Sequence, residues 1–374
     1  MNINDITQLS MQALNRVLLI GAPGIGKTDA IYEYAKDQAA AKHKQFVDLK
    51  EVDKQTLDNI KKEPNKYFAY LRVIAPHIFP EDVSIPRGTD EIMFKSPLTL
   101  DVLNSNLGIE GILFIDELTN VQRADQRVLF YSLIYEGEIG WSLKLSDKMT
   151  IIAAGNPPEW SSDAGLLPAP LVNKMTILKV SPPKVDEWNT YMLTRYGDAW
   201  DQRIASFLFQ HPESFIEDSI DDTERLEGFA TPRAFTTLAV KLKEIDSRET
   251  AEAMIEGIVG NKAASLLVPY LRTMVPTAEE FLDHQELYDT FKTEQKFLIM
   301  NSLAQMLSNK QRMKQYVSKY EQFLNTLVAK DRDMAIILIR MLPKKNRATI
   351  INEPPFATAK KQLIDRLKYL PGII

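Results

Sequence analysis

Residues 21–28 are Gly21-Ala22-Pro23-Gly24-Ile25-Gly26-Lys27-Thr28, which satisfy the pattern G-x-x-x-x-G-K-[ST] without a mismatch. The apolar run Val17-Leu18-Leu19-Ile20 precedes them, and residues 29–35 follow with helical spacing. Glycines allow successive backbone N–H groups and a helix N-terminus to point at one anion. The order of strand, glycine loop and helix therefore predicts a phosphate loop, a name used below for residues 21–28.

Two side chains of the phosphate loop have separate roles in this prediction. Lys27 adds a positive charge for the β- and γ-phosphates, and Thr28 offers its hydroxyl to Mg²⁺. We expect all eight residues to contact the nucleotide. The alternative is a chance match in a glycine-containing turn, which has a probability of roughly one per cent in a chain of this length.

A second landmark is the run Gly111-Ile112-Leu113-Phe114-Ile115-Asp116-Glu117. Its apolar residues predict a central parallel strand, whose carboxyl end opens at the ligand crevice. Asp116 would hold Mg²⁺, and Glu117 would polarise the attacking water. Alone, such a run is more often a helix cap or a turn, but its pairing with an upstream phosphate loop favours a metal site.

Further strands are predicted over residues 45–49, 149–154 and 176–180, and the run 149–154 ends at Gly155-Asn156-Pro157-Pro158. An amide such as that of Asn156 at a strand end can orient the lytic water, although an Asn before two prolines also starts turns. Residues 52–74 are charged and contain one turn residue, Pro64, which predicts helices broken near it. Residues 138–145 alternate and predict a hairpin with Trp141 near its tip.

The composition indicates an α/β protein of several domains. Of 374 residues, 45% are hydrophobic and 25% are charged, as in ordinary globular proteins. The absence of cysteine excludes disulfides, thiolate metal sites and cysteine nucleophiles. No apolar run approaches the length that crosses a bilayer, so we expect a cytoplasmic protein without membrane insertion.

The helical pattern that begins after Ser181-Pro182-Pro183 predicts three domains: an α/β core over residues 1–181, a helical lid over 182–290 and a basic helical extension over 291–374. The extension contains 16 Lys and Arg against six Asp and Glu, whereas the whole chain has a net charge of −5. In the lid, Thr231 can cap a helix that starts at Pro232. Arg233 would then lie where the helix dipole disfavours a cation, which indicates either a ligand or a solvated side chain.

The order of these motifs resembles that of the AAA+ ATPases, specifically the MoxR-like branch that includes dynein-related ATPase domains. Residues 21–28 match Walker A and residues 112–117 match Walker B. Ala153-Ala154-Gly155-Asn156-Pro157 looks like the sensor 1 strand, and Thr231-Pro232-Arg233 is similar to the sensor 2 helix. The resemblance covers roughly residues 14–290.

The resemblance implies an αβα core with a five-stranded parallel sheet in the order 5-1-4-3-2, a helical lid and a ring that is usually hexameric. In such rings Mg-ATP lies between protomers, and a neighbour's arginine reaches the γ-phosphate. This sequence has Lys174 at that position. Because lysine lacks the planar fork of arginine, turnover would be slow unless Arg123 or Arg127 serves instead. Glu117, Asn156, Lys174 and Arg233 are therefore the candidate catalytic residues.

MoxR-like proteins generally remodel other proteins, often with a von Willebrand factor A-type partner. Residues 73–100 and the hairpin around Trp141 are placed like the substrate-contacting insertions of that branch. The leading hypothesis is an Mg²⁺-dependent ATPase that remodels a protein partner. A nucleic-acid motor or loader is the second, supported by the basic extension but opposed by the acidic composition. An ATP-binding scaffold that hardly hydrolyses, suggested by Lys174, is the third.

Overall fold

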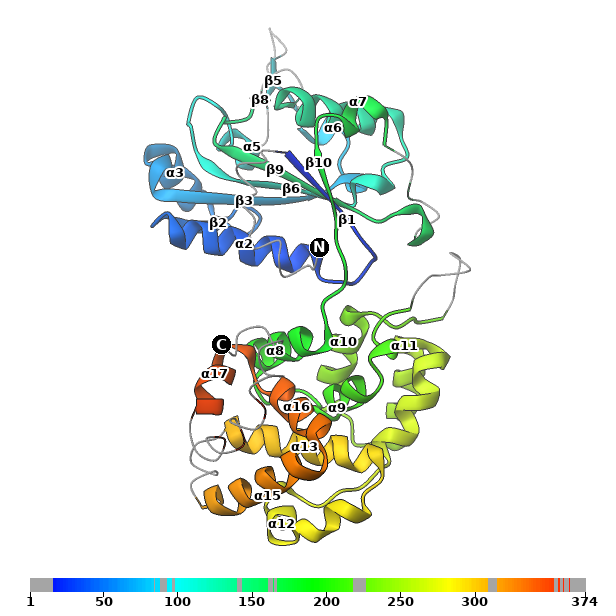
Figure 1. Ribbon diagram of the computed structural model, residues 1–374. Coiled ribbons are helices and arrows are strands. Elements are labelled where there is room, and N and C mark those ends of the chain that lie inside the picture. Colours follow the sequence, from blue (N-terminus) through cyan, green and yellow to red (C-terminus); the bar gives the residue numbers. More distant parts are fainter. Residues whose placement is uncertain are drawn as a thin grey trace. The chain divides into compact units, whose positions relative to one another are not determined.

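The structure, a computed structural model, describes residues 16–83, 85–87, 93–95, 98–139, 143–160, 164, 167–217, 227–308, 315–352, 356, 359 and 363. These residues divide into two compact units on either side of the Pro182–Pro183 junction. The first unit contains a sheet covered by helices, and the second is helical (Figure 1).

The first unit is built on a six-stranded sheet in the order β10-β1-β9-β6-β3-β2, in which all neighbouring strands are parallel. Its strands are β1 (Arg16–Ile20), β2 (Gln45–Asp48), β3 (Tyr67–Ile74), β6 (Glu110–Asp116), β9 (Met149–Gly155) and β10 (Thr176–Lys179). Every residue of β9 is buried, and so are all residues of β6 except the first. Runs of branched apolar residues fit strands that are covered on both faces, which confirms the strands predicted at these positions.

The prediction of five strands in the order 5-1-4-3-2 is wrong. The sheet has a sixth strand, β3, which lies between β6 and β2. The helices predicted over residues 52–74 are confirmed only for α3 (Lys54–Lys62), because residues 67–74 form β3. Phe68 and Tyr70 are buried in this strand, and pairing with β6 favours an extended backbone for such aromatic and branched residues.

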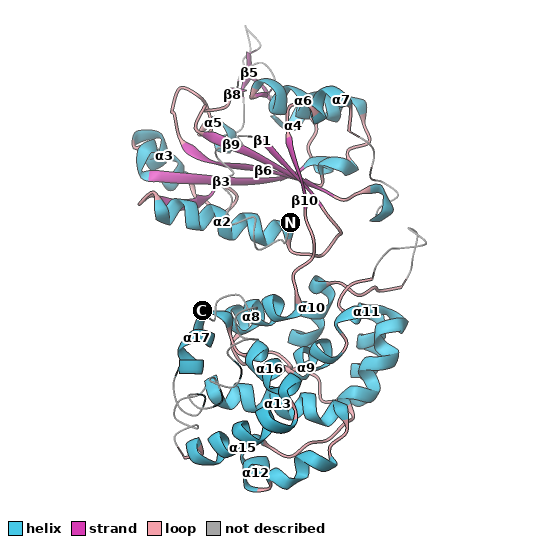
Figure 2. Ribbon diagram, in the orientation of Figure 1, coloured by secondary structure: helices cyan, strands magenta, loops and turns pink. Residues whose placement is uncertain are grey.

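Helices cover both faces of the sheet, with α2 (Lys27–Ala41) on one face and α6 (Ala124–Glu136) on the other (Figure 2). Shorter helices complete the unit: α4 (Pro80–Val83), α5 (Leu98–Asp101) and α7 (Ala169–Val172). Two hairpins extend from it, formed by β4 (Ile85–Arg87) with β5 (Met93–Lys95) and by β7 (Glu138–Ile139) with β8 (Leu143–Lys144). The second hairpin confirms the one predicted over residues 138–145, but Trp141 lies outside the described residues.

The second unit consists of helices around one apolar core. Its helices are α8 (Val185–Tyr196), α9 (Arg203–Gln210), α10 (Pro232–Leu242), α11 (Arg248–Leu271), α12 (Ala278–Asp283), α13 (Thr293–Ser308), α15 (Val317–Lys330), α16 (Arg332–Met341) and α17 (Lys344–Asn352). The core includes residues from both sides of position 291. For example, the rings of Phe281 and Phe323 pack edge to face, with 4.9 Å between their centroids. The boundary between lid and extension stays a prediction.

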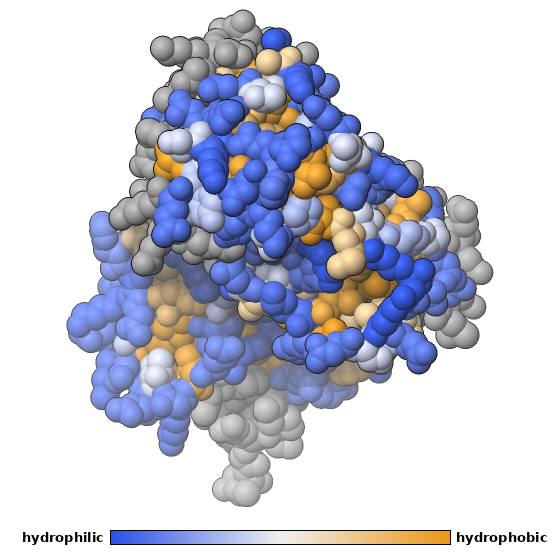
Figure 3. Space-filling model, turned by 90° about the horizontal axis from the view of Figure 1, so that it is seen from below, coloured by the Kyte–Doolittle hydropathy of each residue, from blue (hydrophilic) through white to orange (hydrophobic). Residues whose placement is uncertain are grey.

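Surface polarity follows the usual pattern of a folded chain in water. Hydrophilic side chains cover most of the face in Figure 3, and apolar side chains form separate patches between them. Within the described part of the chain, no helix combines the length and apolar character needed to cross a membrane.

A charge cluster joins the start of β6 to the segment after α2. Lys44 Nζ lies 2.8 Å from Glu110 Oε2, and Lys42 bonds the other carboxylate oxygen. Burial alone would raise the pKa of the Glu110 carboxyl, but the hydrogen bonds and charges of the two ammonium groups outweigh it and lower that pKa below its usual value. The ionised pair therefore stabilises the folded state above the unfolded pKa, and this contribution is lost as the pH falls through the folded pKa.

We predict that Glu110→Gln lowers the free energy of unfolding by about 1 kcal/mol at neutral pH, since solvent screens this half-buried cluster. The difference from wild type should shrink as the pH falls into the acid range. Urea unfolding at a series of pH values measures it. Glu33→Gln, which removes an exposed pair with Lys36, is the control and should have a smaller effect. A Glu110→Gln deficit that stays constant down to strongly acidic pH would contradict the prediction.

Candidate functional site

The phosphate loop connects β1 to α2, and its glycines adopt conformations that other residues disfavour. Gly24 and Gly26 have φ values of 71° and 95°, in the left-handed region. A Cβ on Gly21 would lie 2.6 Å from the carbonyl oxygen of Val180. The backbone N–H of Gly21 donates to the carbonyl of Gly155 at 3.3 Å. The loop is thus held against the edge at which β9 and β10 end.

Lys27 is buried at the first position of α2, and its ammonium group joins two strand ends. Its Nζ donates to the carbonyls of Gly21 (2.7 Å) and Ala22 (2.9 Å) and to Oδ1 of Asn156 (3.0 Å). The predicted phosphate lysine and the predicted sensor amide are 129 residues apart in sequence. The structure brings them into direct contact at one edge of the sheet.

Asp116, the last residue of β6, is buried, and both of its carboxylate oxygens accept hydrogen bonds. Its Oδ2 accepts from Thr28 Oγ1 at 3.0 Å, so the two predicted metal ligands lie together. Its Oδ1 accepts from the backbone N–H of Glu117 at 3.0 Å. Arg72, two residues before the end of β3, also donates to Oδ2, from Nη2 at 2.7 Å and from Nε at 3.0 Å. Sequence reasoning missed Arg72 because it missed β3; the signal was the aromatic and branched run of residues 67–74.

Glu117 follows Asp116 with φ 57° and ψ 34°, a left-handed conformation that is strained for a residue with a Cβ. Its side chain is exposed, whereas the Asp116 side chain beside it is buried. Backbone strain of this kind concentrates at functional sites. The turn therefore places Asp116, the predicted metal ligand, in a buried position and Glu117, the predicted water-activating residue, in an exposed one.

Thr119 fixes the end of β9, and no local pattern in the sequence marks it. Thr119 lies in the short helix η4 (Leu118–Asn120), is buried, and accepts a hydrogen bond from the backbone N–H of Asn156 at 3.0 Å. A Cβ on Gly155 would lie 2.5 Å from Thr119 Cγ2. Glycine at position 155 therefore permits the close approach that positions Asn156.

The three cations considered for contact with a neighbour's nucleotide have different surroundings. Lys174 is exposed after α7, and its Nζ lies 4.3 Å from the ring centre of Tyr135. Arg123 forms an ion pair with Asp125, in which Nη2 lies 2.6 Å from Oδ2. Arg127 donates from Nε to the Val121 carbonyl at 2.9 Å. A role for any of them at a neighbouring protomer stays a prediction.

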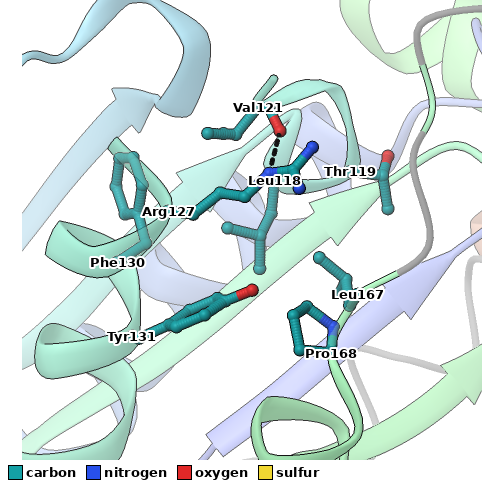
Figure 4. A pocket seen from close by; sticks show the side chains of 8 residues that line it. All are labelled: Leu118, Thr119, Val121, Arg127, Phe130, Tyr131, Leu167 and Pro168. Atoms are coloured by element: carbon teal, nitrogen blue, oxygen red, sulfur yellow. Dashed lines mark hydrogen bonds between the residues drawn. The ribbon is translucent and has the colours of Figure 1, made fainter. Parts of the chain in front are cut away.

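Arg127 also lines a small cavity beside η4. Figure 4 shows its side chain extending from α6 toward Leu118, with the hydrogen bond to Val121 drawn as a dashed line. The cavity is lined by Leu118, Thr119, Val121, Arg127, Phe130, Tyr131, Leu167 and Pro168. Its accessible volume of about 10 Å³ leaves room for no more than a water molecule, so it is not a substrate pocket.

Arg233 belongs to the second unit, in the first turn of α10. Thr231 Oγ1 accepts from the backbone N–H of Ala234 at 3.0 Å, and Pro232 occupies the first helical position, which confirms the predicted cap. The Arg233 side chain is exposed. Its action on a nucleotide stays a prediction.

The residues at the sheet edge fit a magnesium-bound nucleotide. Thr28 and Asp116 offer hydroxyl and carboxylate oxygens, the donors that Mg²⁺ prefers. The left-handed glycines at positions 24 and 26 turn the backbone of a loop that opens directly into the N-terminus of α2. A Cβ at position 21 would collide with the backbone of Val180, just after β10, so the cradle depends on glycine there.

Comparisons with known proteins give only distant structural likenesses. No family model and no curated protein matches this chain. A mutant of Thermotoga maritima RuvB has 15% identity and a TM-score of 0.34, with 84% of this chain and 86% of that chain covered. NtrX from Brucella abortus in complex with ADP has 13% identity and a TM-score of 0.33, with 89% and 67% covered. The Aeropyrum pernix ORC2 protein has 14% identity and a TM-score of 0.33, with 97% and 82% covered. Likeness at this level carries no argument about function, which depends on the site residues.

We predict that Gly155→Ala lowers the free energy of unfolding by about 1–3 kcal/mol, because the new methyl group overlaps the buried Thr119 side chain. Adding Thr119→Ala should restore part of the loss by removing the two nearest of the three contacting atoms, Cγ2 and Oγ1. Chemical denaturation of the two variants measures this. The control is Gly257→Ala, where a Cβ meets nothing within 4 Å. Equal stability of the Gly155 and Gly257 variants would contradict the overlap.

Proposed function

We propose that this chain is an AAA+ ATPase that hydrolyses ATP with Mg²⁺. The observation that carries the proposal is the convergence at one sheet edge of Lys27 with Asn156 and of Thr28 with Asp116, beside the exposed Glu117. Phosphoryl transfer to water needs little covalent chemistry from the protein, so positioning and charge account for most of the rate. This set of side chains supplies both.

Each side chain has a role in the proposed reaction. Bound Mg²⁺ would neutralise charge on the phosphate oxygens, and Thr28 and Asp116 would hold it. Lys27 places a positive charge at the mouth of the phosphate loop, next to the Asn156 amide. Glu117 would orient the attacking water and take up its proton, since its exposed carboxylate lies one residue beyond the metal ligand. Arg233 would report the phosphate state to the lid.

We further propose that the protein acts as a MoxR-like remodeller of protein partners and assembles as a hexameric ring. The support is the motif order, together with two hairpins that extend from the nucleotide-binding unit. A von Willebrand factor A-type protein is the partner class that this resemblance implies. Lys174 would be the cation offered to the neighbouring nucleotide.

The basic C-terminal helices favour this function over a nucleic-acid motor. Lys319 and Lys330 pair with Asp283 and Asp289, and Arg340 lies 3.7 Å from Asp186. These acids precede residue 291, so acidic residues of the same unit already partner part of the excess positive charge. A phosphate backbone would have to compete with them for these cations.

We predict that Glu117→Gln leaves nucleotide binding close to wild type and lowers ATP turnover by about 100-fold or more, because the amide cannot accept the proton of the lytic water. Phosphate release gives turnover, and fluorescent ADP titration gives binding. Glu136→Gln, at an exposed acid on α6, is the control and should retain full activity. Wild-type turnover in Glu117→Gln would refute the role of this residue.

Failure of the wild-type protein to bind ATP or ADP with Mg²⁺ would refute the proposed function as a whole. Acceleration of phosphate release by DNA, together with salt-dependent DNA binding, would replace protein remodelling with the motor function. ATP-dependent oligomers that release negligible phosphate would instead identify the scaffold.

A further inference from the structure

Arg72 is an arginine inside the candidate metal site whose position follows from the unpredicted strand β3. β3 and β6 pair in parallel register, with Arg72 opposite Phe114 and Ile74 opposite Asp116. The Arg72 side chain therefore reaches forward along the sheet edge to the carboxylate at the end of β6. Its guanidinium donates two hydrogen bonds to one atom, Oδ2 of Asp116, at 2.7 and 3.0 Å.

The hydrogen-bonding capacity of this oxygen is already used. Oδ2 accepts the two bonds from Arg72 and a third, at 3.0 Å, from the Thr28 hydroxyl. A carboxylate oxygen offers about two lone-pair sites. The other oxygen, Oδ1, accepts from the backbone N–H of Glu117. A cation, or water molecules in its shell, cannot use Oδ2 unless one of the present donors leaves.

Charge and burial indicate that Arg72 is the donor that leaves. The Asp116 side chain is 9% exposed and depends on a nearby cation, whereas the Arg72 side chain is 35% exposed and can move toward solvent. Thr28 is itself a proposed metal ligand and stays at the site. A guanidinium at Oδ2 and a divalent cation at the same oxygen would repel each other.

We propose that Arg72 is a positioning residue that holds the Asp116 carboxylate in place before nucleotide binds and competes with Mg²⁺ for its Oδ2. The inference rests on the proposed function, since it assigns a task to one more residue of the same site. It makes the Mg²⁺ requirement of nucleotide binding depend on displacing Arg72. In the absence of the metal, Arg72 supplies the positive charge that pairs with the buried carboxylate at the strand end.

The test combines two measurements on Arg72→Gln, Arg72→Lys and the matched control Arg248→Gln, which removes an exposed arginine that pairs with Glu252. The first is the Mg²⁺ concentration that half-saturates binding of fluorescently labelled ADP, with a parallel titration in EDTA. The second is a double-mutant cycle of Arg72→Gln with Asp116→Asn, read by thermal unfolding without nucleotide.

In Arg72→Gln the half-saturating Mg²⁺ concentration should fall by about tenfold, because a close competing charge has been removed. Arg72→Lys keeps the charge but not the two-pronged contact and should change less. Binding in EDTA should match wild type, and the double-mutant cycle should show that the two substitutions are coupled. The control, Arg248→Gln, should leave the half-saturating Mg²⁺ concentration and the binding of ADP in EDTA unchanged. If Arg72→Gln fails to fold, Arg72→Lys still shows the lowered Mg²⁺ requirement in smaller measure.

Several outcomes would overturn the inference. An unchanged or higher Mg²⁺ requirement in both variants would show that Arg72 does not compete with the metal. Weaker ADP binding of Arg72→Gln in EDTA would show that the guanidinium contacts phosphate instead. Additive effects in the double-mutant cycle would show that the pair does not form in solution. A wild-type protein that binds no Mg-nucleotide refutes the proposed function, and with it the competition; a wild-type protein that binds while the variants behave identically refutes the inference alone.

Discussion

Parallel pairing of β1 with β9 and of β9 with β6 is the constraint on which the site depends. Ile20 lies opposite Gly155, and Ile115 lies opposite Ala153, so the strands end at a common edge. Carboxyl ends of parallel strands share one edge of a sheet, and the loops that follow them meet there. A slip of one residue would turn the Asp116 side chain to the opposite face and separate it from Thr28.

Close approach of the backbone at two glycines positions the phosphate loop and the Asn156 turn at this edge. Gly21 lies against Val180, and Gly155 lies against Thr119, each with no room for a Cβ. The N–H of Gly21 also bonds the carbonyl of Gly155. Larger residues at either position would push the phosphate loop and the Asn156 turn apart. The contact between Lys27 and Asn156 therefore depends on atoms that these glycines lack.

The parts of the site that the sequence could predict lie within short, continuous segments. The phosphate loop and the acids after β6 each have a local pattern, and the rule for strand ends was enough to predict that they meet. β3 was missed because residues 52–66 beside it are charged and partly helical, and its extended form depends on pairing with β6. Arg72 and Thr119 were missed for the same reason, since only tertiary contacts give them a role. The predicted number and order of the strands were wrong because β3 was not predicted.

The surroundings of the candidate cations bear on the speed of the proposed reaction. Arg123 is engaged by Asp125, and Arg127 by the Val121 carbonyl, so each would have to give up an existing partner before reaching a phosphate. Lys174 rests on the exposed ring of Tyr135, a contact worth only about 0.5–1 kcal/mol at an exposed site. The Lys174 ammonium can therefore leave the Tyr135 ring at small cost. Because its single ammonium cannot grip two phosphate oxygens as a guanidinium does, a ring that depends on Lys174 would stabilise the transition state less than one with arginine there.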